Sequence, residues 1–480
     1  MREQVTFTAA EAADCIVAFA TPPGQSALAV LRLSGAAAFL LADSLFKPQP
    51  NFPRIKDLEG YTMSYGYWLD CRGKALDEVV IAAFRAPHSY TGENLIEISC
   101  HGGQAPRRRI LNSLLEIGAT PAAAGEFSRR AFLNGKLDLS QAEAVMDLIA
   151  SVSERQGELA LAQRRGSVKE AIKELSNKLY QALAKVEMLI EFADEDGLES
   201  TAEVKLASDL QSILHNAAEQ ITDLLESYRQ GRAIREGFMV VISGRTNAGK
   251  SSLLNALLGE ERAIVTDISG TTRDRLDCFV DFSGIPLHLI DTAGIREAAD
   301  PVEQEGIRRA EAAVREADLV IRLLNPDFQE VTMAQEYAAI DELLSLDREV
   351  LLLLGKEDLK WSDELITELD KRYPNLDKQF FSKFDDKLIE AVKERIVSQF
   401  EALGPAKDCD SQISNSRQEQ ALQRAGDLLQ DARAALDTAL PLELMASSLR
   451  SAIEEVAKIS GENVSETLID EIFSRFCVGK

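Results

Sequence analysis

The stretch Gly244-Arg245-Thr246-Asn247-Ala248-Gly249-Lys250-Ser251 decides the fold of this 480-residue chain. It fits the pattern GxxxxGK[ST], and it stands between an apolar run, Phe238 to Ile242, and a helical pattern, Ser252 to Leu258. A strand, a glycine-rich turn and a helix in that order form a loop whose backbone N–H groups wrap a phosphate. In such a loop Lys250 contacts phosphate oxygens and the Ser251 hydroxyl binds Mg²⁺.

The sequence around this loop, from about residue 235 to 400, alternates apolar runs with helical patterns. Further strands are predicted at Leu287 to Ile290, Leu319 to Leu324 and Val350 to Leu354. Continuous β-branched and leucine runs between helices indicate a mostly parallel sheet that is covered on both faces.

Two more motifs make this block resemble a GTPase rather than a P-loop kinase. Asp291-Thr292-Ala293-Gly294 follows a predicted strand, so Asp291 is expected to hold Mg²⁺ through water and the Gly294 N–H to contact a γ-phosphate. Gly270-Thr271-Thr272-Arg273-Asp274 lies between the motifs and can bring Thr272 to the ion.

The base-binding motif is degenerate. Gly355-Lys356-Glu357-Asp358 stands where guanine-specific enzymes carry Asn-Lys-x-Asp. Asp358 can still accept from guanine, and the Lys356 stem can cover the ring, but Gly355 lacks the amide that would brace the loop and meet the base. The expected partner loop, Ser-Ala-Lys, is at best Ser382-Lys383. We expect guanine preference with weaker binding.

The residue that orients the attacking water is also unusual. Many switch GTPases have glutamine directly after the Asp-x-x-Gly motif, where this chain has Ile295, which cannot orient water. Glu297, Glu303 and Glu305 are the nearby candidates, although each alone is more typical of a solvated helix carboxylate.

The flanking sequence predicts two other kinds of structure. Strands at Ala27 to Leu33, Val79 to Phe84 and Leu95 to Cys100, with a helix at Ala105 to Ile117, indicate a mixed α+β part. Helical spacing on both sides of the α/β block indicates a helical domain interrupted by an inserted one. The apolar positions at this spacing are Val168, Ile172, Leu175, Leu179, Leu183, Val186 and Ile190, and then Leu422, Ala425, Leu429, Ala432 and Leu436.

Composition limits the classes of protein. The chain is 45% hydrophobic and 27% charged, which is typical of a globular protein, and its apolar runs are too short for a membrane span. The beginning of the chain has no secretory pattern, so we expect a cytoplasmic protein. The net charge is −25, but residues 1–135 hold 13 basic and 13 acidic residues, so this neutral part or a partner must supply any RNA-binding surface. Six scattered cysteines without a CxxC pair indicate reduced thiols.

Motifs along the whole chain resemble those of the MnmE (TrmE) family of tRNA modification GTPases, within the TrmE-Era-EngA-YihA-Septin-like superfamily. The motifs that carry the resemblance are Gly244 to Asn255, Ala263 to Asp274, Asp291 to Glu297, Ala20 to Gly24, Leu31 to Gly35, Tyr90 to Glu93, His101 to Gly103, Gly125 to Ser128, Ala131 to Asn134, Lys136 to Leu139 and Phe476 to Lys480.

The resemblance implies the architecture: a multidomain α+β and α/β protein with an N-terminal folate-binding α+β domain and an α-helical domain into which a P-loop, Ras-like G domain is inserted. The expected limits are 1–135 for the folate-binding domain, 136–234 and 401–480 for the two parts of the helical domain, and 235–400 for the G domain.

The resemblance also implies a function. With the flavoprotein MnmG, in a hetero-oligomer, the family adds an aminomethyl or carboxymethylaminomethyl group to carbon 5 of the wobble uridine of tRNA. The one-carbon unit comes from 5-formyl- or methylene-tetrahydrofolate, and the reaction requires GTP hydrolysis with Mg²⁺ and K⁺. A homodimer with potassium-dependent pairing of G domains is expected as well.

Site residues follow from the same resemblance. Asn247, with the backbone carbonyls of Thr266, Ile268 and Thr271, is expected to bind K⁺; Ser251 and Thr272 bind Mg²⁺, and Glu303 positions the water. The full nucleotide site is expected to comprise Asn247, Ala248, Gly249, Lys250, Ser251, Ser252, Thr266, Asp267, Ile268, Ser269, Gly270, Thr271, Thr272, Asp291, Thr292, Ala293, Gly294, Lys356 and Asp358.

The same resemblance implies a folate site at Arg32, Glu97, Lys136 and Lys480. These residue types suit folate, because its glutamate tail needs cations and its pterin offers donors to a carboxylate. Cys477 is expected near this site, either as a reactive thiol or as a packing residue. Arg107, Arg108 and Arg109 are expected partly on a solvated helix face, with RNA or partner contact as the alternative.

One competing function shares the phosphate loop. A regulatory GTPase switch for RNA or ribosome assembly would hydrolyse GTP only to time an association. Such a switch has no use for a folate site, so the N-terminal block and the motif Phe476 to Lys480 distinguish the two.

Overall fold

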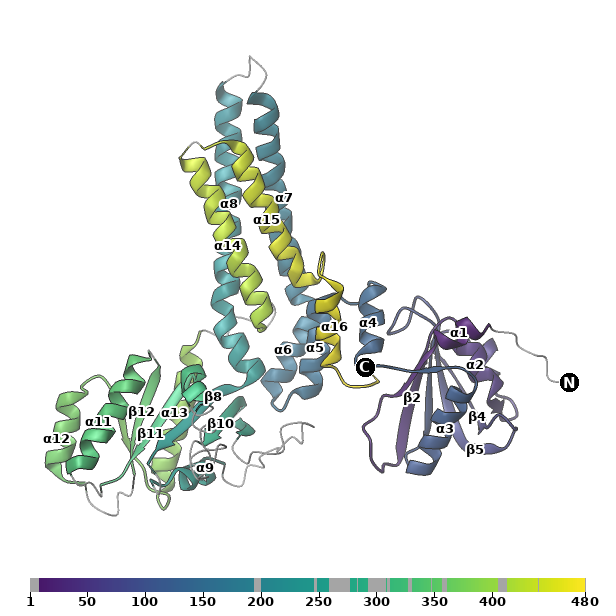
Figure 1. Cartoon of the computed structure of the whole chain (residues 1–480), viewed down its shortest axis with the longest axis horizontal. Coiled ribbons are helices and arrows are strands. Elements are labelled where there is room, and N and C mark those ends of the chain that lie inside the picture. The colour runs from purple at the N-terminus through teal and green to yellow at the C-terminus, as the bar shows by residue number, and fades with distance from the viewer. Residues whose placement is uncertain are drawn as a thin grey trace. The chain divides into compact units, whose positions relative to one another are not determined.

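The computed structural model divides into two compact units, residues 1–146 with 460–480, and residues 147–459. It describes residues 8–193, 200–245, 248–258, 277–282, 284–291, 308, 311–326, 330–346, 348–355, 361–404, 412–438 and 440–479. Figure 1 labels the elements of both units.

The first unit is built on a seven-stranded sheet in the order β3-β4-β5-β6-β2-β1-β7. All pairs are antiparallel except β1 with β7. The strands are β1 (Ile16–Phe19), β2 (Leu28–Ser34), β3 (Phe46–Pro48), β4 (Thr62–Leu69), β5 (Ala75–Phe84), β6 (Leu95–His101) and β7 (Thr120–Pro121). The helices are α1 (Ala9–Ala13), α2 (Ala38–Ser44), η1 (Ile55–Asp57), α3 (Gln104–Glu116), α4 (Glu126–Leu133), α5 (Leu139–Ala150) and α16 (Glu466–Ser474).

Alternation along the central strands gives the sheet a buried and an accessible face. Leu31, Leu33, Ile96 and Ile98 are fully buried in one cluster with residues of α2 and α3. The residues between them on the strands, Arg32 and Glu97 among them, point to the other face because successive side chains of a strand alternate. Glu97 therefore faces away from the core.

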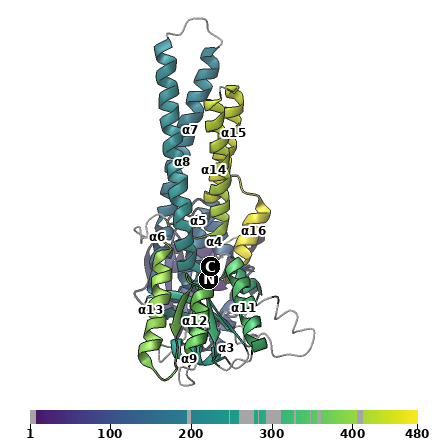
Figure 2. The ribbon, with the colours of Figure 1, turned by 90° about the vertical axis from the view of Figure 1, so that its left-hand side faces the viewer.

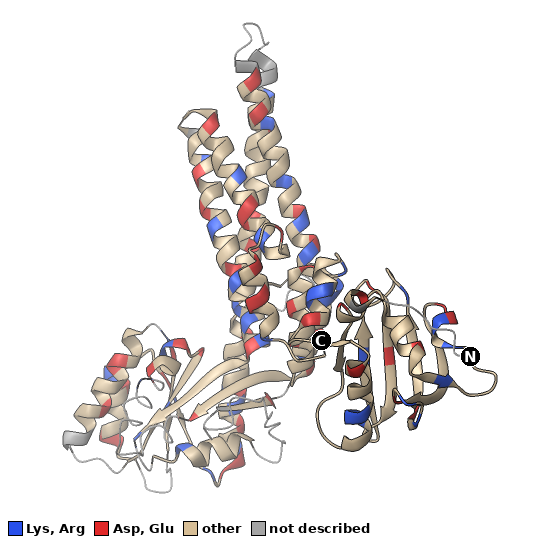
Figure 3. Ribbon diagram, turned by 45° about the vertical axis from the view of Figure 1, so that its right-hand side comes forward, with Lys and Arg blue, Asp and Glu red and all other residues tan. Residues whose placement is uncertain are grey.

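The second unit contains a long helical bundle. Its helices are α6 (Glu154–Arg165), α7 (Ser167–Ala193), α8 (Ser200–Glu236), α14 (Ser416–Asp437) and α15 (Leu442–Ser460). The apolar stripes expected at residues 168–190 and 422–436 face one another in a single core, and Figure 2 shows these helices side by side. Acidic and basic residues are interleaved along α7 and α8 (Figure 3), where Lys185 pairs with Asp209.

The remainder of the second unit is the α/β block. Its six-stranded sheet has the order β13-β12-β11-β8-β10-β9, and only the edge strand β9 is antiparallel to its neighbour. The strands are β8 (Phe238–Gly244), β9 (Asp277–Phe282), β10 (Ile285–Asp291), β11 (Leu319–Leu324), β12 (Glu349–Leu354) and β13 (Asp377–Phe380). The helices are α9 (Lys250–Leu258), α11 (Glu330–Ser345), α12 (Asp363–Arg372) and α13 (Asp386–Ala402).

Helices cover both faces of this sheet, as a parallel sheet requires. Val240 and Ile242 of β8 pack with residues of α9 and α13, whereas Val241 packs on the opposite side. The residues of β11 and β12 divide in the same way, with Leu352 and Leu354 turned toward α11 and α12. The predicted mostly parallel sheet, covered on both faces, is confirmed.

The chain leaves the bundle and returns to it at neighbouring points. Gln163 of α6 donates to the carbonyl of Gln412 (2.8 Å), and Gln412 in turn donates to Gln230 of α8 (2.9 Å). This is what insertion of one block into another requires. The residue limits of the four expected domains stay predictions, and residues 460–480 group with the first unit rather than with the bundle. Over the described ranges, no helix is both long and apolar enough to cross a bilayer.

Candidate functional site

The glycine-rich turn follows β8 directly and leads into α9. Gly244, the last residue of β8, has a φ of +152°, and a Cβ there would lie 2.7 Å from the Leu323 carbonyl oxygen. Only glycine therefore fits where the chain turns away from β11. The turn places the backbone of residues 248 and 249 at the start of α9, and the N-terminus of a helix favours an anion.

Lys250 lies inside this turn. Its side chain is buried, and Nζ donates to the carbonyl oxygens of Gly244 (2.9 Å) and Arg245 (2.8 Å). A buried ammonium group held by two carbonyl groups stays in place as a point charge, which is what a phosphate-binding lysine supplies.

Ser251 and Asp291 meet at the carboxyl edge of the sheet. Asp291 ends β10, which is parallel to β8 with Asp291 opposite Ile242, and Ser251 is in the first turn of α9. The Ser251 hydroxyl donates to Asp291 Oδ2 at 3.3 Å, and Asp291 is buried. A hydroxyl and a carboxylate side by side are the kind of oxygen donors that Mg²⁺ prefers.

The base side of the site begins at the ends of β12 and β13. The Gly355 N–H donates to the Leu324 carbonyl (2.8 Å), and the Phe381 N–H donates to that of Leu354 (2.9 Å). The two expected base loops therefore start from adjacent strands, and Ser382-Lys383 follows β13 after one residue, Phe381.

A second cluster lies on the accessible face of the first unit. Arg32 of β2 and Glu97 of β6 are cross-strand partners, and Arg32 Nε donates to Glu97 Oε1 at 2.7 Å. The guanidinium group lies over the ring of Tyr90, 5.6 Å from its centroid, and Tyr90 is hydrogen-bonded to Ser128 of α4 (2.7 Å). A fixed cation and a fixed carboxylate, both about a quarter exposed, can thus meet one polar ligand together.

The loop that carries Tyr90 also reaches Lys136. Lys136 is exposed, and its Nζ donates to the Pro87 carbonyl at 3.0 Å. A Cβ on Gly92 would lie 3.2 Å from Lys136 Cγ, so the loop packs along the lysine stem. Residues 87–92 therefore contact both Arg32 and Lys136, and Arg32 in turn binds Glu97.

The C-terminal tail docks beside this cluster. Val478 forms a bridge with Ala124, and the carbonyl of Gly479 lies 3.5 Å from the Arg32 guanidinium. Gly479 has a φ of +94°, and a Cβ there would lie 2.0 Å from the Phe19 carbonyl oxygen, so the tail can approach only as glycine. Cys477, in the same tail, is exposed.

Comparisons with known proteins agree from end to end. A family model described as GTP-binding protein TrmE N-terminus matches residues 15–136, and one described as MnmE helical domain matches residues 139–477. The tRNA modification GTPase MnmE of Geobacillus kaustophilus is 39% identical over 471 residues, which cover 97% of this chain and 99% of the relative. The MnmE of Bacillus subtilis is 37% identical, with 97% and 100% covered.

The chain belongs to the MnmE family of tRNA modification GTPases. The multidomain fold class and the enzyme class predicted from the sequence, a GTPase, are both confirmed. Two solved structures are also similar in part. The G domain of the T. maritima FeoB iron transporter is 26% identical and covers 34% of this chain and 97% of its own length, with a TM-score of 0.26. A GTP-binding protein of Sulfolobus solfataricus with GDP is 16% identical and covers 62% and 78%, with a TM-score of 0.27. At such scores neither carries an argument.

Many of the site residues expected in this MnmE family member lie outside the described residues, so their roles stay predictions. These are Asn247, Thr266, Asp267, Ile268, Ser269, Gly270, Thr271, Thr272, Thr292, Ala293, Gly294, Glu303, Lys356, Asp358 and Lys480, together with the alternative water-positioning candidates Glu297 and Glu305. Ala248, Gly249, Lys250, Ser251, Ser252 and Asp291 gather at the carboxyl edge of the sheet, as Arg32, Glu97 and Lys136 gather around the Tyr90 loop.

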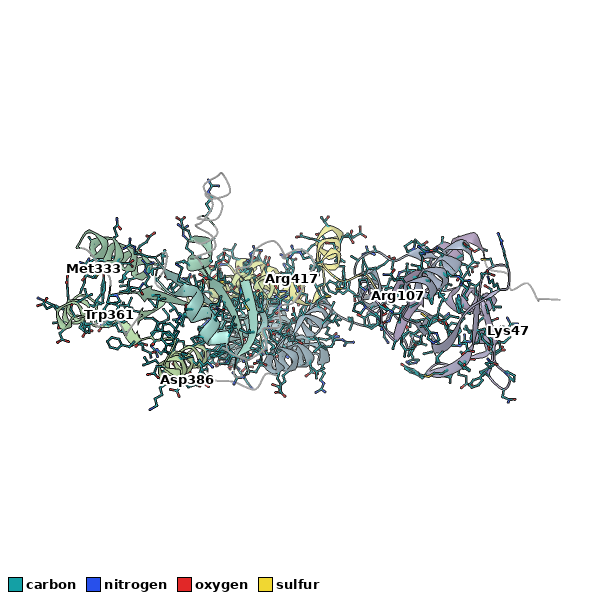
Figure 4. The ribbon with its side chains drawn as sticks, turned by 90° about the horizontal axis from the view of Figure 1, so that it is seen from below. Lys47, Arg107, Met333, Trp361, Asp386 and Arg417 are labelled. Carbon is teal, nitrogen blue, oxygen red and sulfur yellow. The ribbon has the colours of Figure 1, made fainter. Side chains whose placement is uncertain are left out.

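The three arginines of α3 lie partly on a solvated helix face, as expected, and one of the three is buried. Arg108 and Arg109 are exposed, whereas Arg107, labelled in Figure 4, is buried. Its guanidinium group lies over the ring of Phe19 (4.4 Å) and donates to the carbonyls of Pro22 (2.9 Å) and Gly24 (3.2 Å). Arg107 thus holds the turn that connects β1 to β2. A helix pattern reports which residues share a face, but not that a distant loop folds over one of them.

Tyr90, Ser128 and Gly479 were also missed as parts of the second cluster. Each lies within a motif that carries the family resemblance, but their contacts with Arg32 or with each other join segments far apart in the chain. Arg130 braces the same region. Although burial alone would lower it, the charges of Glu93 and Glu126 raise the pKa of Arg130 above its ordinary value.

Proposed function

We propose that the chain is a potassium-dependent GTP hydrolase that acts with the flavoprotein MnmG in modifying carbon 5 of the wobble uridine of tRNA. The added group would be aminomethyl or carboxymethylaminomethyl, and its one-carbon unit would come from a tetrahydrofolate. The observation that carries this proposal is the Arg32–Glu97 pair beside the C-terminal tail, in a chain that also has a GTPase loop. A GTPase that only times the assembly of RNA or ribosomes has no need of such a pair.

In the proposed nucleotide site, Lys250 contacts the phosphate oxygens and the N–H groups of the turn enclose them. Ser251 and Thr272 would hold Mg²⁺, with Asp291 acting through water, and the ion would offset charge on the phosphates. The 3.3 Å contact between the oxygens of Ser251 and Asp291 supports this set of donors.

Hydrolysis needs two further roles, which are proposed for residues outside the described ranges. Asn247, with the carbonyls of Thr266, Ile268 and Thr271, would hold K⁺, which supplies the positive charge that an arginine finger gives elsewhere. Glu303 would position the attacking water, a role that Ile295 cannot fill.

In the proposed folate site, the cations Arg32, Lys136 and Lys480 would meet the glutamate tail, and Glu97 would accept from pterin donors. The ligand would be 5-formyl- or methylene-tetrahydrofolate. The fixed orientation of Arg32, between Glu97 and the Tyr90 ring, supports a site that is formed before the ligand arrives. We also propose that the protein is a homodimer and acts in the cytoplasm, where its tRNA substrates are.

The two sites are tested by separate substitutions in the full chain. Arg32→Ala should abolish binding of 5-formyl-tetrahydrofolate, measured by calorimetry, and leave GTP turnover close to that of the wild type. Ser251→Ala should slow GTP turnover and leave folate binding close to that of the wild type. Arg108→Ala, which removes an exposed arginine of α3, should change neither GTP turnover nor folate binding. In a strain that lacks the native gene, both Arg32→Ala and Ser251→Ala should fail to restore the modified wobble uridine. Absence of folate binding by the wild-type chain would favour the switch function instead.

A further inference from the structure

Position 355 is the point at which this chain departs most clearly from the guanine-binding motif. Gly355 stands where the motif has asparagine, at the end of β12. A Cβ there would lie 3.1 Å from Leu323 Cδ1, 3.2 Å from the Leu324 carbonyl oxygen and 3.3 Å from the side-chain amide of Asn325. The space beside Gly355 is therefore already taken, and one of its occupants is another asparagine.

Asn325 comes from the neighbouring strand. It follows β11, which lies between β8 and β12 in the sheet, so it stands between the phosphate loop after β8 and the base loop after β12. With the carboxamide turned so that its NH₂ group faces the nearby carbonyls, it donates to Ala248 at 2.9 Å and to Leu324 at 3.2 Å. Ala248 belongs to the phosphate loop, so this side chain joins that loop to the edge of the sheet.

Gly355 is held on its other side by Trp361. The indole Nε1 of Trp361 donates to the Gly355 carbonyl at 3.0 Å. The Trp361 ring lies in a buried cluster with Leu354, and partly buried Met333 packs against this cluster (Figure 4). The N–H of Gly355 is bound by the Leu324 carbonyl. The start of the base loop is therefore fixed by its backbone, and no side chain at 355 is needed to anchor it.

We propose that Asn325 takes over, from the adjacent strand, the bracing role that the missing asparagine at 355 has in Asn-Lys-x-Asp GTPases. It is a positioning residue: its amide holds the Ala248 carbonyl of the phosphate loop at a set distance from the start of the base loop. The residues at positions 355 and 325 are then coupled in their effect on nucleotide binding. An asparagine at either position would place its amide in the same small space between the start of the base loop and the Ala248 carbonyl.

If Asn325 positions the two loops, its loss should change base preference as well as nucleotide affinity, which a merely structural role would not predict. Asn325→Ala should weaken the binding of a fluorescent GDP derivative by roughly tenfold, since two hydrogen bonds of a neutral amide are lost. It should also lower the ratio of GDP affinity to ADP affinity, because the phosphate loop and the base loop lose their fixed spacing. Asn325→Ser should have the same two effects, because the serine side chain is too short for its hydroxyl to reach the Ala248 carbonyl. This variant replaces Asn325→Ala in the experiment if the alanine variant does not fold.

The decisive variant removes the amide at position 325 and restores an amide at position 355. Gly355→Asn alone is crowded by Asn325 and should bind GDP no better than the wild type. In Asn325→Ala/Gly355→Asn the amide of residue 325 no longer occupies this space, and the end of the Leu323 side chain can shift to admit the new Cβ. The affinity for GDP and the ratio of GDP to ADP affinity should therefore return to within about threefold of the wild type. Asn415→Ala, which removes the N-cap of α14, controls for a general loss of stability and should leave both readouts unchanged.

Two results would overturn the proposal. One is Asn325→Ala or Asn325→Ser with wild-type GDP affinity and wild-type base preference. The other is a double variant that binds GDP no more tightly than the single alanine variant, because the two positions would then not share one role.

Discussion

The hydroxyl of Ser251 lies 3.3 Å from the carboxylate of Asp291, although 40 residues separate them along the chain. The contact exists because β8 and β10 are parallel neighbours that end at the same edge of the sheet. Ser251→Ala should slow Mg²⁺-dependent GTP hydrolysis by roughly 10²-fold, which is the scale for losing one fixed electrostatic partner. Turnover measured against Mg²⁺ concentration checks this.

A matched control is Ser345→Ala, whose hydroxyl only caps the carbonyl of Glu342 in its own helix. An unchanged Mg²⁺ dependence in Ser251→Ala would exclude this serine from the ion site.

Glu303 is the proposed water-positioning residue. Glu303→Ala should leave GTP binding nearly intact and slow single-turnover hydrolysis by roughly 10²-fold or more, since such a group acts only in the reaction step. Glu297→Ala and Glu305→Ala are the matched controls, because they remove carboxylates from the same segment. If either control slowed hydrolysis and Glu303→Ala did not, the role would belong to that residue.

Arg107 should matter for stability although its neighbours do not. Arg107→Ala removes charged hydrogen bonds to the carbonyls of Pro22 and Gly24 and the contact with Phe19, which together contribute about 2–3 kcal/mol to the free energy of unfolding. Arg108→Ala should change it by less than about 0.5 kcal/mol.

Urea unfolding checks this in a Trp361→Phe background, where buried Trp68 becomes the only tryptophan and reports on the first unit. Equal midpoints for the two arginine variants would contradict the assigned role.

The cysteines of the first unit should differ in reactivity. Burial raises the pKa of both Cys15 and Cys100 to about 11, so neither should react with iodoacetamide at pH 8, where exposed Cys477 should react readily. Burial, and then the hydrogen bond to Glu116, raises the pKa of Cys71, so Glu116→Gln should speed alkylation of Cys71. Peptide mass spectrometry at timed intervals measures each rate.

The same two buried thiols carry a pH dependence of stability. Their pKa values are raised in the folded state, so folding favours the protonated thiols. Their contribution is complete below about pH 9, the ordinary value, and is lost as pH rises toward about 11. Cys15→Ala/Cys100→Ala should flatten that part of the stability curve. Rapid alkylation of either buried thiol at pH 8 in the folded protein would contradict this account.

Local patterns predicted the regular elements well. The apolar run at Leu319 to Leu324 is β11 without change, and the stripe from Val168 to Val186 is buried along α7. The helical spacing matches the one buried face of α7, whereas the continuous apolar run matches a strand that is buried on both faces. The α+β strands were found where the alternation is strong, whereas β4, with tyrosines on its accessible side, was not predicted.

Contacts between distant segments of the chain could not be predicted from the sequence. The antiparallel edge strand β9, the docking of Gly479 at Phe19 and the position of Asn325 beside Gly355 each depend on which strands become neighbours. The sequence shows that position 355 lacks the asparagine amide of the base-binding motif, from which weaker base binding is expected. Only the order of strands in the sheet shows that the amide of Asn325 lies beside position 355.

Potassium dependence is the most direct test of the account, because it depends on Asn247, an unspecified position of the phosphate-loop pattern, acting as an ion ligand. GTP turnover of the full chain should be measured in KCl and in NaCl at equal ionic strength and Mg²⁺. The account predicts turnover at least roughly tenfold faster in KCl, since a bound cation replaces a missing transition-state charge. Equal rates in the two salts would contradict it.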